Sequence, residues 1–342
     1  MAVIVLVSIL IAAVVPLAVL FLVANQVTQS NTRELARDKA AIVVQSIEGY
    51  VTQYLDAVPP QAAQLGKLVG DGEAALRQPD ATARLFSAAM AATPQVTTLS
   101  LATFEGRVLR VFRNRPDRAV RLGDWSDDHA FLAKIEAYRD APAGRWAGLF
   151  FAESVRRPFL NYIVPLPGPA PDGVIIASVS LAEMSRYLGS LQGHLLGTPF
   201  ILRGADAVLA HPRLPEIFDT LSDDAPLPAI ADVPDAALPS IWSERRARKL
   251  ETRLANSVES RVVEVDGARE AFLFRALDGY DDEAWLVGVH LPMSVIAPQL
   301  DRLKLLVIAG VAAIVAALAI SLLLTRSLTA LQQESNNIFT QK

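Results

Sequence analysis

The sequence predicts an α+β chain, in which a long N-terminal helix and two antiparallel-sheet modules are flanked by two transmembrane helices. Two apolar runs without a charged residue stand near the ends of the chain, Val3 to Ala24 and Leu305 to Leu324. Between them, a stretch with helical periodicity precedes two groups of strand-like segments separated by glycine, proline and aspartate. We therefore expect folded modules that are held at both ends by membrane spans.

Residues 1–24 and 304–324 are the two predicted spans. Each apolar run has about 20 residues or more, enough for a helix to cross roughly 30 Å of hydrocarbon. No Lys or Arg precedes the first run, which is also longer than the apolar core of a signal peptide. We therefore interpret it as a retained anchor, with cleavage as the alternative, and Pro16 can be accommodated inside such a helix.

Residues 25–58 are predicted to form a stalk helix and dimer interface. Apolar side chains recur at helical intervals along one face: Leu35, Ile42, Ile47, Tyr50, Tyr54 and Val58. Pro59 and Pro60 are expected to end the helix, because proline lacks an amide donor and clashes with the preceding turn. The alternative is a core helix without a signalling role.

Residues 59–192 are predicted to form the first, membrane-distal module. Short helices are expected over Gln61–Val69, Asp80–Ala92 and Ala182–Leu191. Strands are expected over Val96–Ala102, Arg107–Phe112, Phe159–Leu166 and Gly173–Leu181. The first two strands are separated by Glu105-Gly106, which indicates a hairpin.

Residues 193–303 are predicted to form the second, membrane-proximal module. Strands are expected over Phe200–Arg203, Val208–Ala210, Val258–Val265, Glu270–Ala276 and Ala284–Leu291. The proline-rich segment Pro212–Pro239 predicts an irregular loop, and Ser240–Leu254 predicts a charged helix. Basic residues in Glu244–Arg253 indicate a solvated helix face, with anionic lipid headgroups as the alternative partner.

Composition excludes several functional classes. The formal net charge is −4, which gives no electrostatic basis for binding nucleic acid. The chain has no cysteine, so disulfides and thiolate chemistry are excluded. No nucleophile-elbow, P-loop or zincin motif occurs, and we predict no catalytic residue and no cofactor. The histidines are isolated in sequence, which predicts no metal cluster, and His211 is interpreted as a turn residue, with a ligand or proton sensor as the alternative.

Three segments resemble a known family: Phe200–Pro212, Ala284–Pro292 and Gly173–Met184. With the helix and spans in the same order, the chain resembles the double-Cache sensor domain of bacterial transmembrane receptors. The resemblance implies two PAS-like sheet modules in the periplasm, a two-pass protein of the inner membrane, and a homodimer. It also implies a small-molecule ligand in the membrane-distal module.

The final segment, residues 325–342, resembles the start of a HAMP linker. Its apolar and small side chains follow the a/d spacing of a parallel coiled coil: Leu328, Leu331, Ser335 and Ile338. This resemblance implies a cytoplasmic output domain, weakly favouring an adenylate or guanylate cyclase over a histidine kinase, a diguanylate cyclase or a chemoreceptor. The alternatives are a membrane-anchored periplasmic binding protein or enzyme without cytoplasmic output, and a structural anchor that recruits a partner.

The candidate ligand-binding residues come from the first module. The family resemblance implies an Arg, Trp and Tyr cluster with a later Asp, and this chain offers Arg121 and Trp125, with Ser178 at the Asp position and no Tyr after Trp125. The aromatic residues expected to wall the pocket are Trp146, Phe150 and Tyr162. An arginine would bind a carboxylate, so we predict an anionic or amino-acid-like ligand, with Arg110 and Arg157 as alternative partners. In the opposing interpretation the aromatic residues are core and the arginines are solvated.

Overall fold

The computed structural model describes residues 41–113, 120–152, 155–192, 197–243, 248–249 and 258–296, with a few helical residues between 309 and 327. Residues 40–292 form one compact unit. The first predicted span, most of the second, and the coiled-coil positions Leu328, Leu331, Ser335 and Ile338 lie outside the described residues. Within the described part of the chain, no helix is both long and apolar enough to span a bilayer.

The helical segments of the first module bury regularly spaced apolar side chains. Residues 41–56 are helical, and after a turn at Ala57 the chain continues as α2 (Val58–Val69). The two prolines therefore lie in the first turn of α2, where a missing amide donor has little cost, instead of ending one long helix. The buried stripe is Val44, Ile47, Val51, Leu55 and Val58.

The predicted apolar face of the N-terminal helix needs correction. Ile42 was expected on it but is 60% exposed, and Leu35 lies outside the described residues. The stripe at 44, 47, 51, 55 and 58 follows the spacing of three and four residues more strictly than the predicted set. Tyr54 is half-buried at its margin and stacks on Tyr187 with ring centroids 4.5 Å apart.

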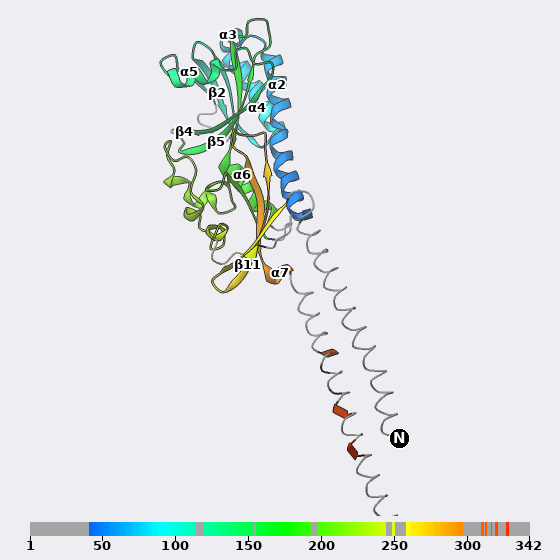
Figure 1. Ribbon diagram of the computed structural model, residues 1–342. Coiled ribbons are helices and arrows are strands. Elements are labelled where there is room, and N and C mark those ends of the chain that lie inside the picture. Colours follow the sequence, from blue (N-terminus) through cyan, green and yellow to red (C-terminus); the bar gives the residue numbers. More distant parts are fainter. Residues whose placement is uncertain are drawn as a thin grey trace, which may run out of the picture. The chain divides into compact units, whose positions relative to one another are not determined.

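The distal module is built on a six-stranded antiparallel sheet with the order β3-β2-β1-β6-β5-β4 (Figure 1). Its strands are β1 (Val96–Thr103), β2 (Arg107–Phe112), β3 (Val120–Asp124), β4 (Arg145–Ala152), β5 (Arg157–Pro165) and β6 (Gly173–Ser180). Its helices besides α2 are α3 (Gly72–Leu76), α4 (Pro79–Ala92), α5 (His129–Glu136) and α6 (Leu181–Leu191). The predicted Glu105-Gly106 hairpin is confirmed by the pairing of β1 with β2.

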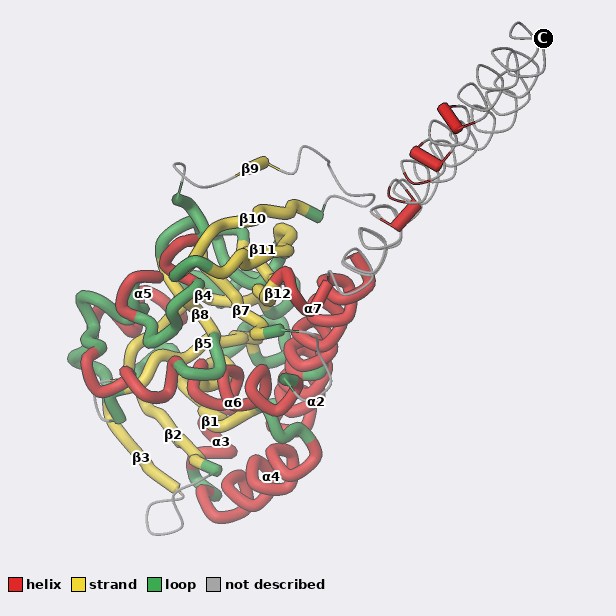
Figure 2. Tube along the Cα trace, turned by 90° about the horizontal axis from the view of Figure 1, so that it is seen from below, coloured by secondary structure: helices red, strands yellow, loops and turns green. Residues whose placement is uncertain are grey.

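The two faces of the distal sheet are covered differently. Helices α2, α4 and α6 contact its strands from one side, and Figure 2 shows α5 on the other. On the α5 side a small cluster packs at one end of the sheet, including Ala102, Val108, Ile176, Ile135 and Tyr138. The rest of that face is not filled by this cluster, which leaves space for a cavity.

The proximal module repeats the architecture with the strand order β8-β7-β12-β11-β10-β9. Its strands are β7 (Thr198–Arg203), β8 (Ala207–Ala210), β9 (Arg248–Lys249), β10 (Glu259–Val265), β11 (Ala268–Leu277) and β12 (Trp285–Pro292). Its short helices are η2 (Leu214–Thr220), η3 (Ile230–Asp232), η4 (Leu238–Ser240) and, after the last strand, α7 (Met293–Ile296). Asp266 and Gly267 both have positive φ, 49° and 81°, as a two-residue type I′ hairpin turn requires.

Several local predictions differ from the structure. Arg248 and Lys249 form β9, which pairs with Arg261 and Val262 of β10, so the predicted helix Ser240–Leu254 is wrong there. The reason is tertiary, since the edge of β10 offers backbone partners to an extended segment. The loop Pro212–Pro239 contains the three short helices η2, η3 and η4. Strand β3 was missed because all of its residues are exposed, which removes the alternation that reveals a strand.

Polar and aromatic contacts join the proximal sheet to the N-terminal helix. The Tyr280 hydroxyl donates to Asp56 Oδ1 at 2.7 Å, and Arg275 forms an ion pair with Glu48 at 2.6 Å. Tyr280 also stacks on Trp285, with ring centroids 5.4 Å apart. The helix 41–56 therefore contacts both α6 of the distal module and the sheet of the proximal module.

Candidate functional site

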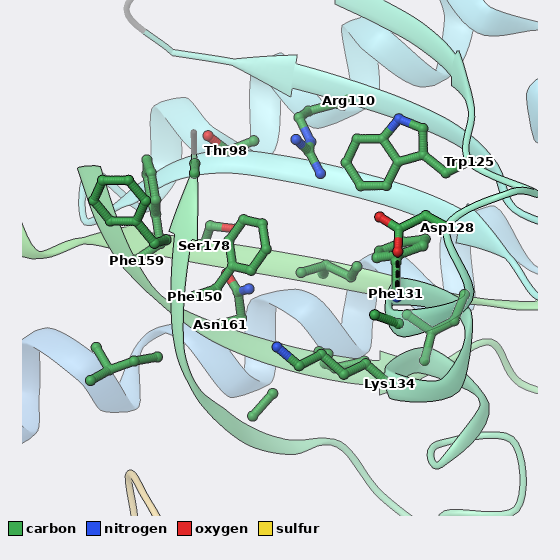
Figure 3. Close-up of a pocket in the computed structure, with 18 of the residues that line it drawn as sticks. Thr98, Arg110, Trp125, Asp128, Phe131, Lys134, Phe150, Phe159, Asn161 and Ser178 are labelled. Atoms are coloured by element: carbon green, nitrogen blue, oxygen red, sulfur yellow. Dashed lines mark hydrogen bonds between the residues drawn. The ribbon is translucent and has the colours of Figure 1, made fainter. Parts of the chain in front are cut away.

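The distal module contains a cavity of about 900 Å³ between its sheet and α5. Strands β1, β2, β5 and β6 supply the floor, while α5 and β4 supply the walls (Figure 3). Asp223 and Pro226, from the irregular segment of the proximal module, also line it. The volume lies within the range of small-molecule sites, about 300–1,000 Å³.

A row of polar side chains crosses the cavity floor. Thr98 of β1 pairs with Ser178 of β6, which pairs with Asn161 of β5. Directly opposed residues of an antiparallel sheet project from the same face, and all three line the cavity. The row therefore places two hydroxyls and an amide side by side on a floor that is otherwise largely apolar.

Asn161 carries an unsatisfied polar atom at this site. Its Oδ1 is buried and has no hydrogen-bond partner within the described chain. A buried polar atom without a partner costs roughly 1–3 kcal/mol, so such atoms mark positions where a ligand or water supplies the missing donor. Asn161 Oδ1 thus offers an acceptor to whatever occupies the cavity.

Arg110 supplies a cation to the same cavity. Its Nε donates to Ser100 Oγ at 3.1 Å, and its guanidinium lies 4.5 Å from the centroid of the Trp125 ring (Figure 3). No carboxylate forms an ion pair with it among the described residues. Burial, followed by repulsion from Arg121, lowers the pKa of Arg110 to about 10. A half-buried guanidinium in this setting favours a bound anion.

Helix α5 contributes one charge of each sign to the wall. Asp128 caps the helix by accepting from the Phe131 amide at 2.9 Å, and Phe131 packs edge-on against Trp125 at 4.7 Å. Lys134 lies one turn further on, with Nζ 5.7 Å from the centroid of the Phe150 ring. The cavity therefore combines cationic, anionic and apolar surfaces, as binding of a small polar ligand requires.

The structure brings only some of the predicted site residues together. Trp125, Phe150 and Ser178 line the cavity. Arg121 lies opposite Arg110 on edge strand β3 and is exposed. Trp146 and Tyr162 are not among the lining residues and pack edge-on against each other at 5.3 Å. Ligand binding by the predicted set stays a prediction.

The structure places the two alternative arginines in different surroundings. Arg110 lines the cavity, whereas Arg157 is paired with Asp219 at 2.9 Å. The lining residues that the sequence did not assign to the ligand pocket include Thr98, Asp128, Lys134 and Asn161. A signal for Thr98 existed, since Thr98 and Ser100 interrupt an apolar strand at alternate positions. Asn161 likewise interrupts the apolar strand Phe159–Leu166, whereas Lys134 gave no such signal.

Comparisons with solved structures find the same fold in bacterial sensory domains. The sensory domain of the Campylobacter jejuni chemoreceptor Tlp3 (CcmL) matches with a TM-score of 0.55 at 9% identity, over 79% of this chain and 99% of that chain. A structure of the Tlp3 sensory domain with isoleucine bound matches with a TM-score of 0.53 at 10% identity, over 79% and 97%. The ligand-binding domain of the Pseudomonas fluorescens chemoreceptor CtaA in complex with L-leucine matches with a TM-score of 0.50 at 14% identity, over 78% and 99%.

The likeness is one of fold. A scan against protein-family models and a search of curated proteins both find no match. The matches cover 78–79% of this chain, whose described residues form two antiparallel sheets with helices. This agrees with the two sheet modules that the sequence predicts.

Proposed function

We propose that this chain is the sensory input part of a bacterial transmembrane receptor, and that the distal cavity binds a small amino-acid-like anion. The observation that carries the proposal is Arg110, a half-buried guanidinium that faces the cavity without a carboxylate partner in the described chain. Structurally similar domains of Tlp3 and CtaA are known with isoleucine and L-leucine bound, which supports this ligand class.

The lining residues suggest how such a ligand would lie. Its carboxylate would pair with Arg110, because guanidinium and carboxylate match in charge and geometry. Its ammonium would be held by Asn161 Oδ1 and by the carboxylate of Asp128. An aliphatic side chain would pack on Ile163 and Ile176. Each group of the ligand thus meets a complementary part of the wall.

Signal transfer would use the contacts that join the modules to the N-terminal helix. A ligand shifts a conformational equilibrium only by its difference in affinity for the two states. The ion pair Arg275–Glu48 and the Tyr280–Asp56 hydrogen bond connect the proximal sheet to helix 41–56. We propose that rearrangement of the distal module moves this helix, and that the movement continues into the predicted membrane spans.

The wider architecture belongs to the same proposal. Residues 1–24 and 304–324 would span the inner membrane, 25–58 would form the stalk of a homodimer, and 59–192 and 193–303 would be the two periplasmic modules. Residues 325–342 would begin a HAMP linker toward an output domain, for which a nucleotide cyclase is the first hypothesis. A histidine kinase, a diguanylate cyclase and a chemoreceptor are the alternatives.

The experiment is calorimetric titration of the purified full chain with amino acids, simple carboxylates, polyamines and purines. Arg110→Gln and Arg121→Gln form a matched pair, because the two arginines lie opposite each other but only Arg110 lines the cavity. Removing a charge-assisted contact of about 1.5–3 kcal/mol should weaken binding about 10–100-fold in Arg110→Gln. Arg121→Gln should bind about as tightly as the unaltered chain, or slightly less tightly, because Arg121 is exposed and contributes only a screened attraction to the anion.

Two results would overturn the proposal. One is a folded chain that binds nothing in the panel. The other is unchanged affinity in Arg110→Gln with strong loss in Arg121→Gln, which would place the anion on the edge strand instead of in the cavity. For any amino acid that binds, the same titration with its decarboxylated amine tests the role of the carboxylate. Loss of binding by the amine would show that the carboxylate is the recognised group.

A further inference from the structure

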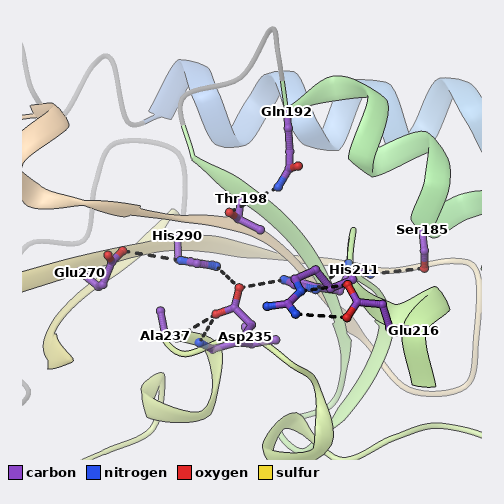
Figure 4. Close-up of polar contacts among 11 residues, drawn as sticks. Ser185, Gln192, Thr198, His211, Glu216, Asp235, Ala237, Glu270 and His290 are labelled. Carbon is purple, nitrogen blue, oxygen red and sulfur yellow. Dashed lines mark hydrogen bonds and ion pairs between the residues drawn. The ribbon is translucent and has the colours of Figure 1, made fainter. Parts of the chain in front are cut away.

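Two histidines and an aspartate meet inside the proximal module. His211 follows β8, Asp235 lies between η3 and η4, and His290 belongs to β12 (Figure 4). One ligand atom from each lies within 4.8 Å of the others. His211 is 0% exposed and His290 is 7% exposed. The three residues are far apart in sequence, which is why the sequence predicts no metal cluster.

We propose that His211, Asp235 and His290 form a buried zinc-binding site. His211 Nε2 lies 3.4 Å from Asp235 Oδ2, and His290 Nε2 lies 3.3 Å from the same oxygen. Ligand atoms about 2.0–2.2 Å from a tetrahedral zinc ion are about 3.3–3.5 Å from one another. The two measured distances therefore fit two edges of such a tetrahedron. Two imidazoles and one carboxylate leave a fourth position for water or another ligand.

The hydrogen-bond pattern points to the same centre. His211 Nε2 and both ring nitrogens of His290 are buried without an aligned hydrogen bond to any described residue. Buried polar atoms normally find partners, so the two unsatisfied nitrogens that face one carboxylate oxygen, His211 Nε2 and His290 Nε2, point to a group that binds all three atoms. A divalent cation satisfies the facing nitrogens and the carboxylate at once, and it offsets the negative charge of Asp235.

The surrounding residues orient the proposed ligands. Asp235 Oδ1 accepts from the amides of Ala237 and Leu238 at 2.8 and 2.9 Å, which leaves Oδ2 for the metal. Glu270 Oε2 lies 3.6 Å from His290 Nδ1, the position from which a carboxylate commonly supports a metal-bound histidine. In Figure 4, Glu270, His290, Asp235 and His211 form a continuous line of contacts.

His211 must change its protonation to bind metal. Its Nδ1 accepts from the Arg213 amide at 3.2 Å, which places the ring proton on Nε2 in the metal-free chain. Zinc at Nε2 requires that proton to move to Nδ1, where it would meet the N–H of Arg213, so the Arg213 amide has to turn away and its hydrogen bond is lost. That bond is at the long end of the normal range, so its loss is a modest cost beside a metal–nitrogen bond.

A zinc ion here would connect three separate parts of the proximal module. It would tie the segment after β8 and the loop between η3 and η4 to β12, the strand that immediately precedes α7 in the chain. This inference does not depend on ligand binding in the distal cavity, so either proposal can fail while the other holds.

The test is titration of the purified, chelator-treated full chain with zinc chloride, followed by calorimetry and by thermal unfolding. We expect one zinc ion per chain, and a rise in melting temperature of about 5–10 °C when free zinc is about 100-fold above its dissociation constant. Calcium should not substitute, because it prefers oxygen ligands in a larger coordination shell.

Substitutions test which residues bind the zinc ion. Asp235→Asn keeps the size of the side chain and the acceptor for the Ala237 and Leu238 amides, and it should weaken zinc binding by more than about 100-fold. Glu270→Gln should weaken it about 10-fold, because it supports a ligand without binding the metal. His129→Gln is the matched control, since His129 is exposed on α5 of the other module and does not belong to this cluster.

Each outcome of the zinc titration either supports or overturns the proposed site. Stoichiometric zinc that is lost in Asp235→Asn and kept in His129→Gln supports the site. Absence of zinc binding by the unaltered chain overturns it, and so does equal affinity in Asp235→Asn, which would place zinc on surface residues. Circular dichroism of each metal-free variant shows whether the variant folds. If Asp235→Asn does not fold, His211→Gln provides an independent substitution of a zinc ligand.

Discussion

The distal and proximal modules place similar strands in the same order, but the corresponding face of the sheet is used differently. In both sheets the first strand lies beside the last, β1 beside β6 and β7 beside β12. The distal row Thr98, Ser178 and Asn161 lines a cavity of about 900 Å³. The corresponding central strands of the proximal sheet carry the row Phe200, Gly288 and Phe274, which lies against a filled core.

The difference comes from side-chain volume on the floor of each sheet. A Cβ added at Gly288 would lie 2.5 Å from Leu273 O and 2.8 Å from Phe200 Cζ, so no space remains there. The short helices η2 and η3 cover this face with buried residues such as Leu214, Phe218 and Ile230. Where small polar residues replace the phenylalanines, the same topology leaves a cavity. The presence of a cavity is thus decided by a few side chains on a shared framework.

The largest expected effect tests the filled face. Phe200→Ala should lower the free energy of unfolding by about 3–5 kcal/mol, because Phe200 is fully buried and its loss leaves a void. Phe159→Ala, at a half-buried position that lines the distal cavity, should cost clearly less. Urea denaturation of both variants measures the difference, and equal losses would contradict the contrast between the two faces.

A second substitution makes the distal floor resemble the proximal one. Ser178→Leu adds volume to the cavity and should weaken ligand binding by more than about 100-fold, while the free energy of unfolding changes by less than about 1–2 kcal/mol. Thr98→Val is the control, since it removes a hydroxyl of the same row without adding volume. Calorimetry on both variants gives the comparison, and tight binding by a folded Ser178→Leu chain would exclude the cavity as the site.

The contacts that the proximal sheet makes with helix 41–56 predict a smaller effect. Burial, followed by the contact with Asp56, raises the pKa of Tyr280, so its hydroxyl is protonated and donates. Tyr280→Phe removes this hydrogen bond and should reduce the free energy of unfolding by about 1–2 kcal/mol. The proposed signal transfer predicts that affinity for a distal ligand also changes, because coupling between two sites is reciprocal, and unchanged affinity would show that this contact is not coupled to the cavity. Tyr162→Phe serves as the control, because its hydroxyl makes no hydrogen bond within the described chain.

The smallest expected effect is a pH dependence confined to the distal module. The guanidinium of Arg110 is charged below its pKa of about 10 and loses its proton above it. Affinity for a carboxylate ligand without an amino group should therefore be constant below that pKa and fall as pH rises through it. In Arg121→Gln the fall should move to higher pH, because part of the repulsion that lowers the pKa of Arg110 is removed. A flat affinity profile across this pKa would show that Arg110 does not hold the carboxylate.

Most strands could be predicted from the sequence because their burial alternates or runs continuously over short distances. The hairpin of β1 and β2 and the strands β5, β6, β10, β11 and β12 follow from local patterns of this kind. Strands β3 and β4 could not be predicted in this way, because neither has alternating or continuous burial: β3 is exposed throughout and β4 is mostly half-buried. The segment at Arg248 became a strand only because β10 offered an edge.

The candidate sites also divide into features that local sequence patterns predict and features that depend on tertiary structure. The sequence by itself determined that an arginine and aromatic residues of the first module were available, and that small side chains such as Ser178 lay in its strands. It could not distinguish Arg110 from Arg121, because their order of burial depends on which strand lies at the sheet edge. Nor could it bring His211, Asp235 and His290 together. Local periodicity records which face a side chain occupies, whereas proximity across the sheet depends on long-range strand order, which only the tertiary structure decided.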